Sequence, residues 1–139
     1  MSISQSMVSS FKAEVLGGVH DLDTDTIKMA LYTSIATLSA ATTAYTTTEE
    51  VVGTNYVAGG NTLTSPVISV DGTTGICDFA DTTWASSTIT ARGALVYNSS
   101  KANRAIAVLD FGSDKISTDG DFTVIMPAAT ASTALIRIA

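Results

Sequence analysis

The chain has 139 residues, 45% of them hydrophobic, and a formal net charge of −6 at pH 7. This length fits one ordinary domain with a real core, and no stretch approaches the roughly 20 apolar residues that a membrane span needs. The seven basic residues are scattered along an acidic chain, which argues against a nucleic-acid interface.

The N-terminal segment carries apolar residues at helical spacing. Ile3, Met7, Phe11 and Val15 recur every four residues, which predicts an amphipathic helix over residues 3–16. Gly17–Gly18 is a typical helix end. This apolar stripe either docks on its own domain or reaches a neighbouring subunit, and we nominate its four residues as a candidate intersubunit contact. No basic region precedes an apolar run, so we expect no secretory signal.

Strand patterns begin after a polar connector that ends at Asp25. Residues 26–34 alternate apolar and polar side chains, which predicts a half-buried strand. Residues 35–50 are small and Thr-rich, and we expect a long surface loop with a short helical turn near residues 48–52. Asp71–Gly72 lies between two apolar runs, 66–70 and 75–79, and therefore predicts a hairpin.

The second half of the chain contains short apolar runs separated by polar turns. The expected strands are residues 82–84, 87–90, 91–97, 105–111, 122–126 and 134–138. A polar turn over residues 98–104 predicts a second hairpin, Asp119–Gly120 predicts a further turn, and Pro127 ends the strand before it.

These patterns predict an all-β protein: an antiparallel β-sandwich with one short N-terminal helix, for which a jelly-roll or Greek-key arrangement is one option. We divide the chain into an N-terminal helix or arm with its connector (residues 1–25) and a β-sandwich domain (residues 26–139). The residues expected in the core or at a subunit interface are Trp84, Ile106, Val108, Leu109, Phe122, Val124, Leu135 and Ile136.

The polar residues near the end of the expected helix allow two interpretations. His20 stands beside Asp21 and Asp23, as in an acid–base pair or a metal site. Asp21, Asp23 and Asp25 also have the alternating spacing of a calcium loop, but the glycine and the distant Glu of such a loop are missing. An ordinary solvated acidic turn is the favoured interpretation.

The remaining reactive or aromatic residues have structural interpretations. Cys77, the one cysteine, rules out an intramolecular disulfide and a Cys-rich zinc site, and its neighbours favour a small buried residue. Trp84 with Tyr32, Tyr56 and Tyr97 could form a sugar-binding platform, although a lone Trp more commonly fills a core. We therefore predict no catalytic, cofactor-binding or metal-binding residues, and no enzyme.

Four stretches of the chain resemble small virion structural proteins of tailed bacteriophages. They are residues 11–34 (FKAEVLGGVHDLDTDTIKMALYTS), 55–64 (NYVAGGNTLT), 78–112 (DFADTTWASSTITARGALVYNSSKANRAIAVLDFG) and 120–139 (GDFTVIMPAATASTALIRIA). Some members of that family resemble capsid decoration, or cement, proteins. The Thr-Trp, Ala-Arg-Gly-Ala and Leu-Asp-Phe-Gly pieces are the most specific part of the resemblance.

The resemblance implies a homo-oligomer, with a trimer as the favoured order, that binds the major capsid protein on the outside of the head. It implies synthesis in the bacterial cytoplasm and a final location on the virion, with no cofactor, nucleic acid or membrane partner. Two alternatives remain: a head-fibre or tail module that binds a host glycan, and a tail or neck component. Exposed aromatic residues would favour glycan binding, and buried ones would favour decoration.

Overall fold

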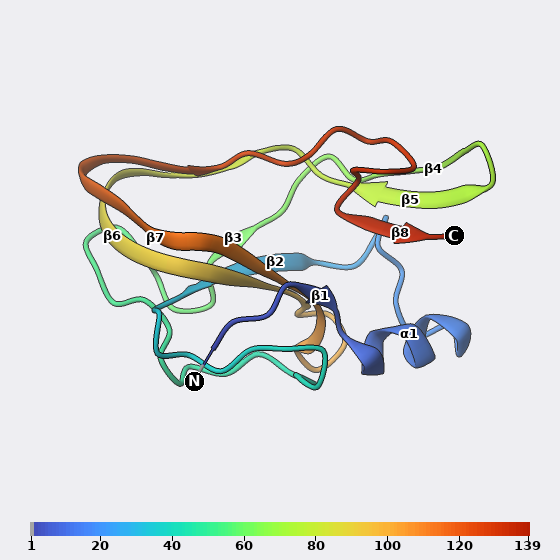
Figure 1. The fold of residues 1–139 in the computed structure, drawn as a ribbon, viewed down its shortest axis with the longest axis horizontal. Coiled ribbons are helices and arrows are strands. Elements are labelled where there is room, and N and C mark those ends of the chain that lie inside the picture. Colours follow the sequence, from blue (N-terminus) through green and yellow to red (C-terminus); the bar gives the residue numbers. More distant parts are fainter. Residues whose placement is uncertain (1) are drawn as a thin grey trace.

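The computed structural model describes residues 2–139, and it is mostly β-structure with one short helix (Figure 1). Met1, the first residue of the predicted arm, lies outside the described residues. The elements are β1 (Ser6–Met7), α1 (Ser9–Leu16), β2 (Ile27–Tyr32), β3 (Asn61–Thr62), β4 (Val67–Asp71), β5 (Thr74–Asp78), β6 (Thr82–Asn98), β7 (Arg104–Val124) and β8 (Ile136–Ile138).

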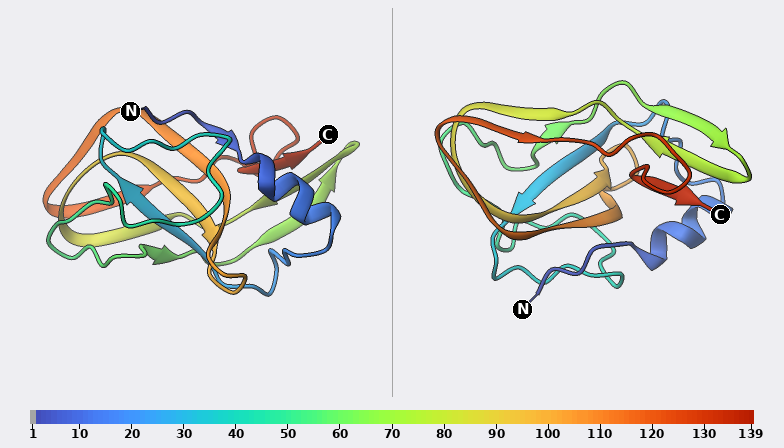
Figure 2. Two further views of the ribbon diagram at one scale, coloured as in Figure 1. Left: turned by 90° about the horizontal axis from the view of Figure 1, so that it is seen from below. Right: turned by 45° about the horizontal axis from the view of Figure 1, so that its top comes forward.

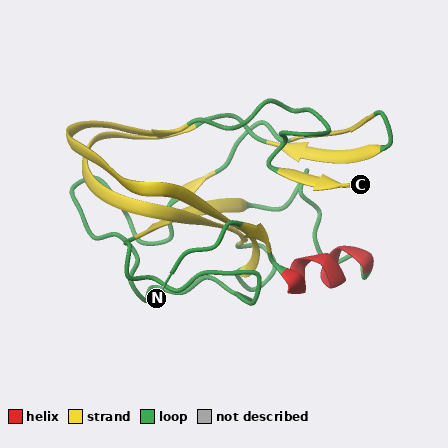
Figure 3. Ribbon diagram, viewed as in Figure 1, coloured by secondary structure: helices red, strands yellow, loops and turns green. Residues whose placement is uncertain are grey.

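The strands form two antiparallel sheets, which confirms the sandwich-like all-β fold. The larger sheet has the order β1-β7-β6-β2-β3, and the smaller one has the order β4-β5-β8. The helix lies at one end of the molecule, and long loops cover much of the larger sheet (Figure 3). Both expected hairpins are present: β4 pairs with β5 around Gly72, and β6 pairs with β7 around residues 99–103.

The β6–β7 hairpin builds both layers of the sandwich. Figures 1 and 2 show the two paired strands bending back at the end far from β4 and β5. Three extra residues of β7 lie between the pairs Ala91–Lys115 and Gly93–Asp110, and such an irregularity bends a strand pair. Gly112 has a φ of 82° at this point. Asp110 stabilises this irregularity, because its carboxylate accepts hydrogen bonds from Arg92 Nε at 3.0 Å and from the Gly112 amide.

Strand β2 is the centre of the core. The prediction of a half-buried strand was wrong here, because Met29, Ala30, Leu31 and Tyr32 are all fully buried. The loop between β2 and β3 covers the second face of the strand with side chains that include Leu38, Val51 and Tyr56. A strand covered on both faces loses the alternation of exposed and buried side chains.

The residues expected in the core are buried or partly buried. Trp84, Ile106, Val108, Phe122, Val124 and Ile136 are buried, and Leu109 and Leu135 pack partly buried against the same cluster. Ile3, Val8 and Phe11 belong to that cluster too, so the N-terminal segment and the strands share one core.

Three local predictions were wrong. The helix begins at Ser9 rather than at residue 3, because Ser6 and Met7 pair with β7 and Ile3 bridges to Leu38. The chain does not turn at Asp119–Gly120: residues 105–111 and 122–126 belong largely to one continuous strand, as do residues 82–97. Residues 48–52 form no helix, although 48 and 49 lie in a turn.

Candidate interaction surfaces

The four residues nominated for an intersubunit contact have different environments. Ile3 and Phe11 are buried within their own chain, whereas Met7 and Val15 are only partly buried. Backbone hydrogen bonds hold the segment in place, from Val8 N to Ile106 O at 2.9 Å and from Ser9 N to Ala40 O at 2.8 Å. Ile3 and Phe11 therefore support the fold directly. An intersubunit contact of Met7 and Val15 stays a prediction.

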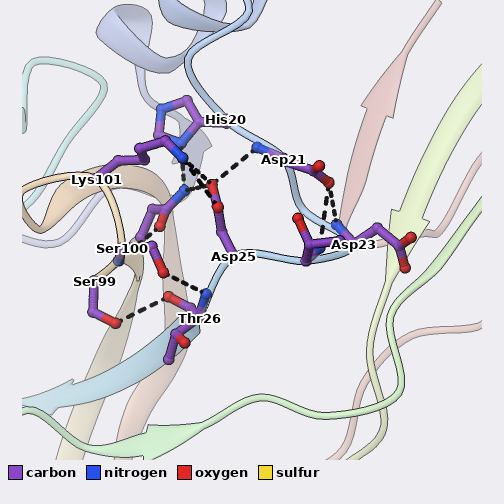
Figure 4. A network of polar contacts seen from close by, with 10 residues as sticks. His20, Asp21, Asp23, Asp25, Thr26, Ser99, Ser100 and Lys101 are labelled. Carbon is purple, nitrogen blue, oxygen red and sulfur yellow. Dashed lines mark hydrogen bonds and ion pairs between the residues drawn. The ribbon is translucent and has the colours of Figure 1, made fainter.

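His20 is the centre of a polar network that joins α1 to the β6–β7 turn (Figure 4). Its side chain is fully buried, 4.9 Å from the Phe11 ring. The Asn98 amide nitrogen lies 3.0 Å from Nδ1, and a Glu14 carboxylate oxygen lies 2.9 Å from Nε2. Because an amide nitrogen only donates, Nδ1 accepts and the Nε2 proton is donated to Glu14. Both ring nitrogens are thus engaged in holding the helix against the turn.

Asp25 extends this network to the β6–β7 turn. Its carboxylate accepts hydrogen bonds from Asn98 at 2.8 Å, from the Asp21 amide at 3.0 Å and from Lys101 Nζ at 3.1 Å. These bonds, with Asn98 contributing most, lower the pKa of Asp25 to about 2. The residue sequence alone did not indicate this role, because Asn98 and Lys101 lie more than 70 positions further along the chain.

The acidic triplet does not converge on a common point. Asp21 accepts hydrogen bonds from the backbone amides of Asp23 and Thr24, while Asp23 points away from Asp25 (Figure 4). Within residues 2–139, no group of three or more His, Cys, Asp or Glu side chains is placed to hold a metal ion. Asp21 and Asp23 are exposed in a surface loop, whereas Asp25 is partly buried in the network around His20.

The aromatic residues of the suggested sugar platform are enclosed. Trp84, Tyr32, Tyr56 and Tyr97 are all buried. Trp84 lies between the rings of Tyr56 and Phe122, with centroid separations of 6.0 and 6.1 Å. Burial raises the pKa of Tyr97 to about 12 and pushes the other tyrosine pKa values up as well. These residues therefore offer no open face for stacking against a sugar ring.

Glu50 is buried, although its sequence context predicts a surface loop. The hydroxyl groups of Tyr45 and Tyr56 each donate to its carboxylate at 2.6 Å, and the Gly59 amide donates at 2.8 Å. Three donors compensate the loss of hydration that a buried carboxylate suffers. The cluster fixes the β2–β3 loop against the core, and we assign it a structural role.

Cys77 is buried in β5, as predicted. Burial, helped by the nearby Asp78, raises the pKa of its thiol to about 12. The thiol therefore stays protonated near neutral pH, which is the unreactive form.

One surface is unusually apolar: the outer strand of the β4–β5 hairpin, called here the hairpin edge (residues 67–71). Every residue of β4 is exposed, and the exposed fractions of Val67, Ile68 and Val70 are 48%, 55% and 72%. The hairpin extends beyond the rest of the molecule in Figure 1, and β4 pairs only with β5. An exposed apolar edge strand is a template for pairing with another chain.

A second surface is a groove between the two sheets. It consists of two adjoining hollows of about 640 and 490 Å³ that share Gln5, Leu109, Leu135 and Arg137. Its lining comes from β1, α1 and β7, from β5 and β8 of the smaller sheet, and from the segment between β7 and β8. Leu109, Phe111, Phe122 and Leu135 give the hollows an apolar lining.

Comparisons with known proteins identify no relative. No family model matches the chain, and no curated protein or solved structure matches it either. Across residues 2–139, no helix is long and apolar enough to cross a membrane.

Proposed function

We propose that this chain is a structural protein of a tailed-bacteriophage virion. It decorates the outer surface of the assembled head as a homo-oligomer, with a trimer as the favoured order, and its partner is the major capsid protein. The role is mechanical and needs no catalytic residue, cofactor or metal. The sequence resemblance provides the starting point for this proposal.

The observation that carries the proposal is the contrast between the enclosed aromatic residues and the exposed aliphatic hairpin edge. Glycan binding uses accessible aromatic rings, whereas Val67, Ile68 and Val70 provide an aliphatic strand suited to protein contact. A single edge of this size gives a weak contact. Repetition around an oligomer on a symmetric shell makes many weak contacts add up by avidity.

The rest of the fold suits the same role. One core joins the N-terminal segment, both sheets and the β2–β3 loop, so the surfaces are held by a well-packed scaffold. The net charge of −6 favours solubility before assembly. A rigid, acidic β-domain with a limited apolar edge is what a component added late to a preformed shell requires.

The direct test is to locate the protein in purified virions of the phage that encodes it, by electron cryo-microscopy. We expect β-rich density of this size in many copies on the outside of the head. Added full-length protein should also bind shells that lack it and sediment with them. Density confined to the tail or neck would replace decoration with that alternative. Density on fibres, together with binding to host glycans, would replace it with host recognition.

A further inference from the structure

Unpaired cations gather around the groove between the sheets. Of the seven Lys and Arg residues, Arg92, Lys101 and Arg104 form ion pairs with Asp110, Asp25 and Glu14. The other four form no ion pair with any described residue. Three of these four, Lys12, Lys115 and Arg137, line the groove.

The side chains of the groove offer these cations little negative charge. Asp110 is its one carboxylate side chain, and Arg92 already binds that carboxylate. Arg137 borders both hollows, while Lys115 borders the larger one and Lys12 the smaller one, so the positive charges follow the length of the groove. In a chain with a net charge of −6, this local excess of cations favours an acidic ligand.

One free strand edge, that of β8, also borders the groove. β8 pairs with β5 on one side and has no strand on the other. The β7 edge across the groove is occupied, because β1 pairs with Ala107 and Val108 and the Asp110 amide donates to Gln5 Oε1 at 3.0 Å. Unpaired backbone groups beside an apolar floor are features that bind an extended peptide by strand addition.

We propose that the groove binds an acidic, extended segment of a partner protein, which adds a strand to β8. Alternate side chains of the segment lie on Leu109, Phe111 and Leu135, and its carboxylates approach Lys12, Lys115 and Arg137. Binding of such a segment depends on the chemistry of this groove and is independent of where the protein sits in a virion.

The test uses the full-length protein labelled with ¹⁵N and two end-blocked heptapeptides, one alternating valine with aspartate and the other alternating valine with lysine. We expect the aspartate peptide to shift the amide signals of residues 109–111 and 136–138 and to slow hydrogen exchange in β8. The lysine peptide should bind at least tenfold more weakly. Binding should also weaken as salt rises, since the charged groups lie at the surface.

Matched variants test how much the positive charge of the groove contributes to peptide binding. Lys115→Gln and Arg137→Gln should each weaken binding about threefold, as expected for a partly exposed ion pair. The double variant Lys12→Gln and Lys115→Gln removes two cations of the groove and leaves the residues of β8 unchanged. Lys28→Gln, which changes an unpaired cation outside the groove, should leave the affinity unaltered.

Three results would overturn the proposal. The first is no binding up to about 5 mM of the aspartate peptide, a concentration that detects even very weak contacts. The second is equal binding of the two peptides, or shifts confined to β4. The third is a concentration-dependent shift of the groove signals without peptide, which would assign the groove to a second copy of this chain.

Discussion

Asp25 lies just before β2, and its hydrogen bonds connect this part of the chain to the connector after α1 and to the β6–β7 turn. Its pKa of about 2 lies below the ordinary value of 3.8, so the folded state favours the ionised form. The resulting stabilisation is fully present above about pH 4 and is lost as the pH falls through about 2. Because Lys101 is partly exposed, solvent screening reduces the effect, and we expect about 1 kcal/mol.

Asp25→Asn should therefore lower the free energy of unfolding by about 1 kcal/mol at pH 7 and by almost nothing at pH 2. Denaturant unfolding at several pH values measures this difference. Asp23→Asn is the matched control, because the Asp23 side chain is exposed and points away from the network. A constant deficit from pH 7 to pH 2 would show that the carboxylate charge is not what stabilises the network.

Two isoleucines on β7 test the assignment of the core. Ile106 is fully buried, whereas the exposed fraction of Ile116 is 68%. Ile106→Ala should lower the free energy of unfolding by about 2–5 kcal/mol, the usual cost of a cavity in a packed core. Ile116→Ala should change it by less than about 0.5 kcal/mol. Similar melting temperatures for the two variants would contradict the packing of β7.

The alternation of larger and smaller apolar residues along the strand was enough to predict that Ile106 and Val108 are buried, because a strand places every second side chain on the same face. It could not find Glu50, whose burial depends on tyrosine hydroxyls brought together by the fold. Gly60 shows a similar limit. A Cβ at this position would lie 1.8 Å from the Met29 carbonyl oxygen, a contact that only glycine avoids. Such contacts between distant segments leave no local pattern.

At the scale of elements, the boundaries of β7 depended on its partner. Asp119–Gly120 has the composition of a turn, and Asp119 does adopt a positive φ of 49°. The chain nevertheless continues, because residues 82–91 of β6 provide partners on both sides of this irregularity. The N-terminal helix is shortened for the same reason, since pairing of Ser6 and Met7 with β7 competes with helix formation. Local propensity did not determine either outcome.

The helix provides a direct test of whether the N-terminal segment supports the fold. Phe11 is buried against His20, while Leu16 on the same helix is 89% exposed. Phe11→Ala should lower the free energy of unfolding by about 3–5 kcal/mol, and Leu16→Ala should have almost no effect. Equal, small effects in thermal unfolding would mean that α1 is a detachable arm and would favour an intersubunit role for the whole stripe.

At the scale of the whole molecule, the hairpin edge and the net charge act in opposite directions on self-association. The edge offers unpaired backbone groups and three exposed aliphatic side chains, which favour contact between copies. A charge of −6 on each copy opposes it. Because salt screens repulsion between surface charges but leaves apolar contacts intact, we expect the oligomer to become more stable as salt concentration rises.

Val70→Lys tests this surface. Val70 is 72% exposed, so the change should leave the melting temperature nearly unaltered, while a charge on the edge strand disfavours pairing between copies. We expect self-association, measured by analytical ultracentrifugation, to weaken at least tenfold. Val52→Lys is the matched control, because Val52 is 98% exposed in the β2–β3 loop, away from the hairpin edge. Equal weakening by both variants would point to general charge effects. If the wild-type protein stays monomeric at about 100 μM in high salt, the prediction that it self-associates in solution is wrong. Assembly would then require contacts with the capsid shell.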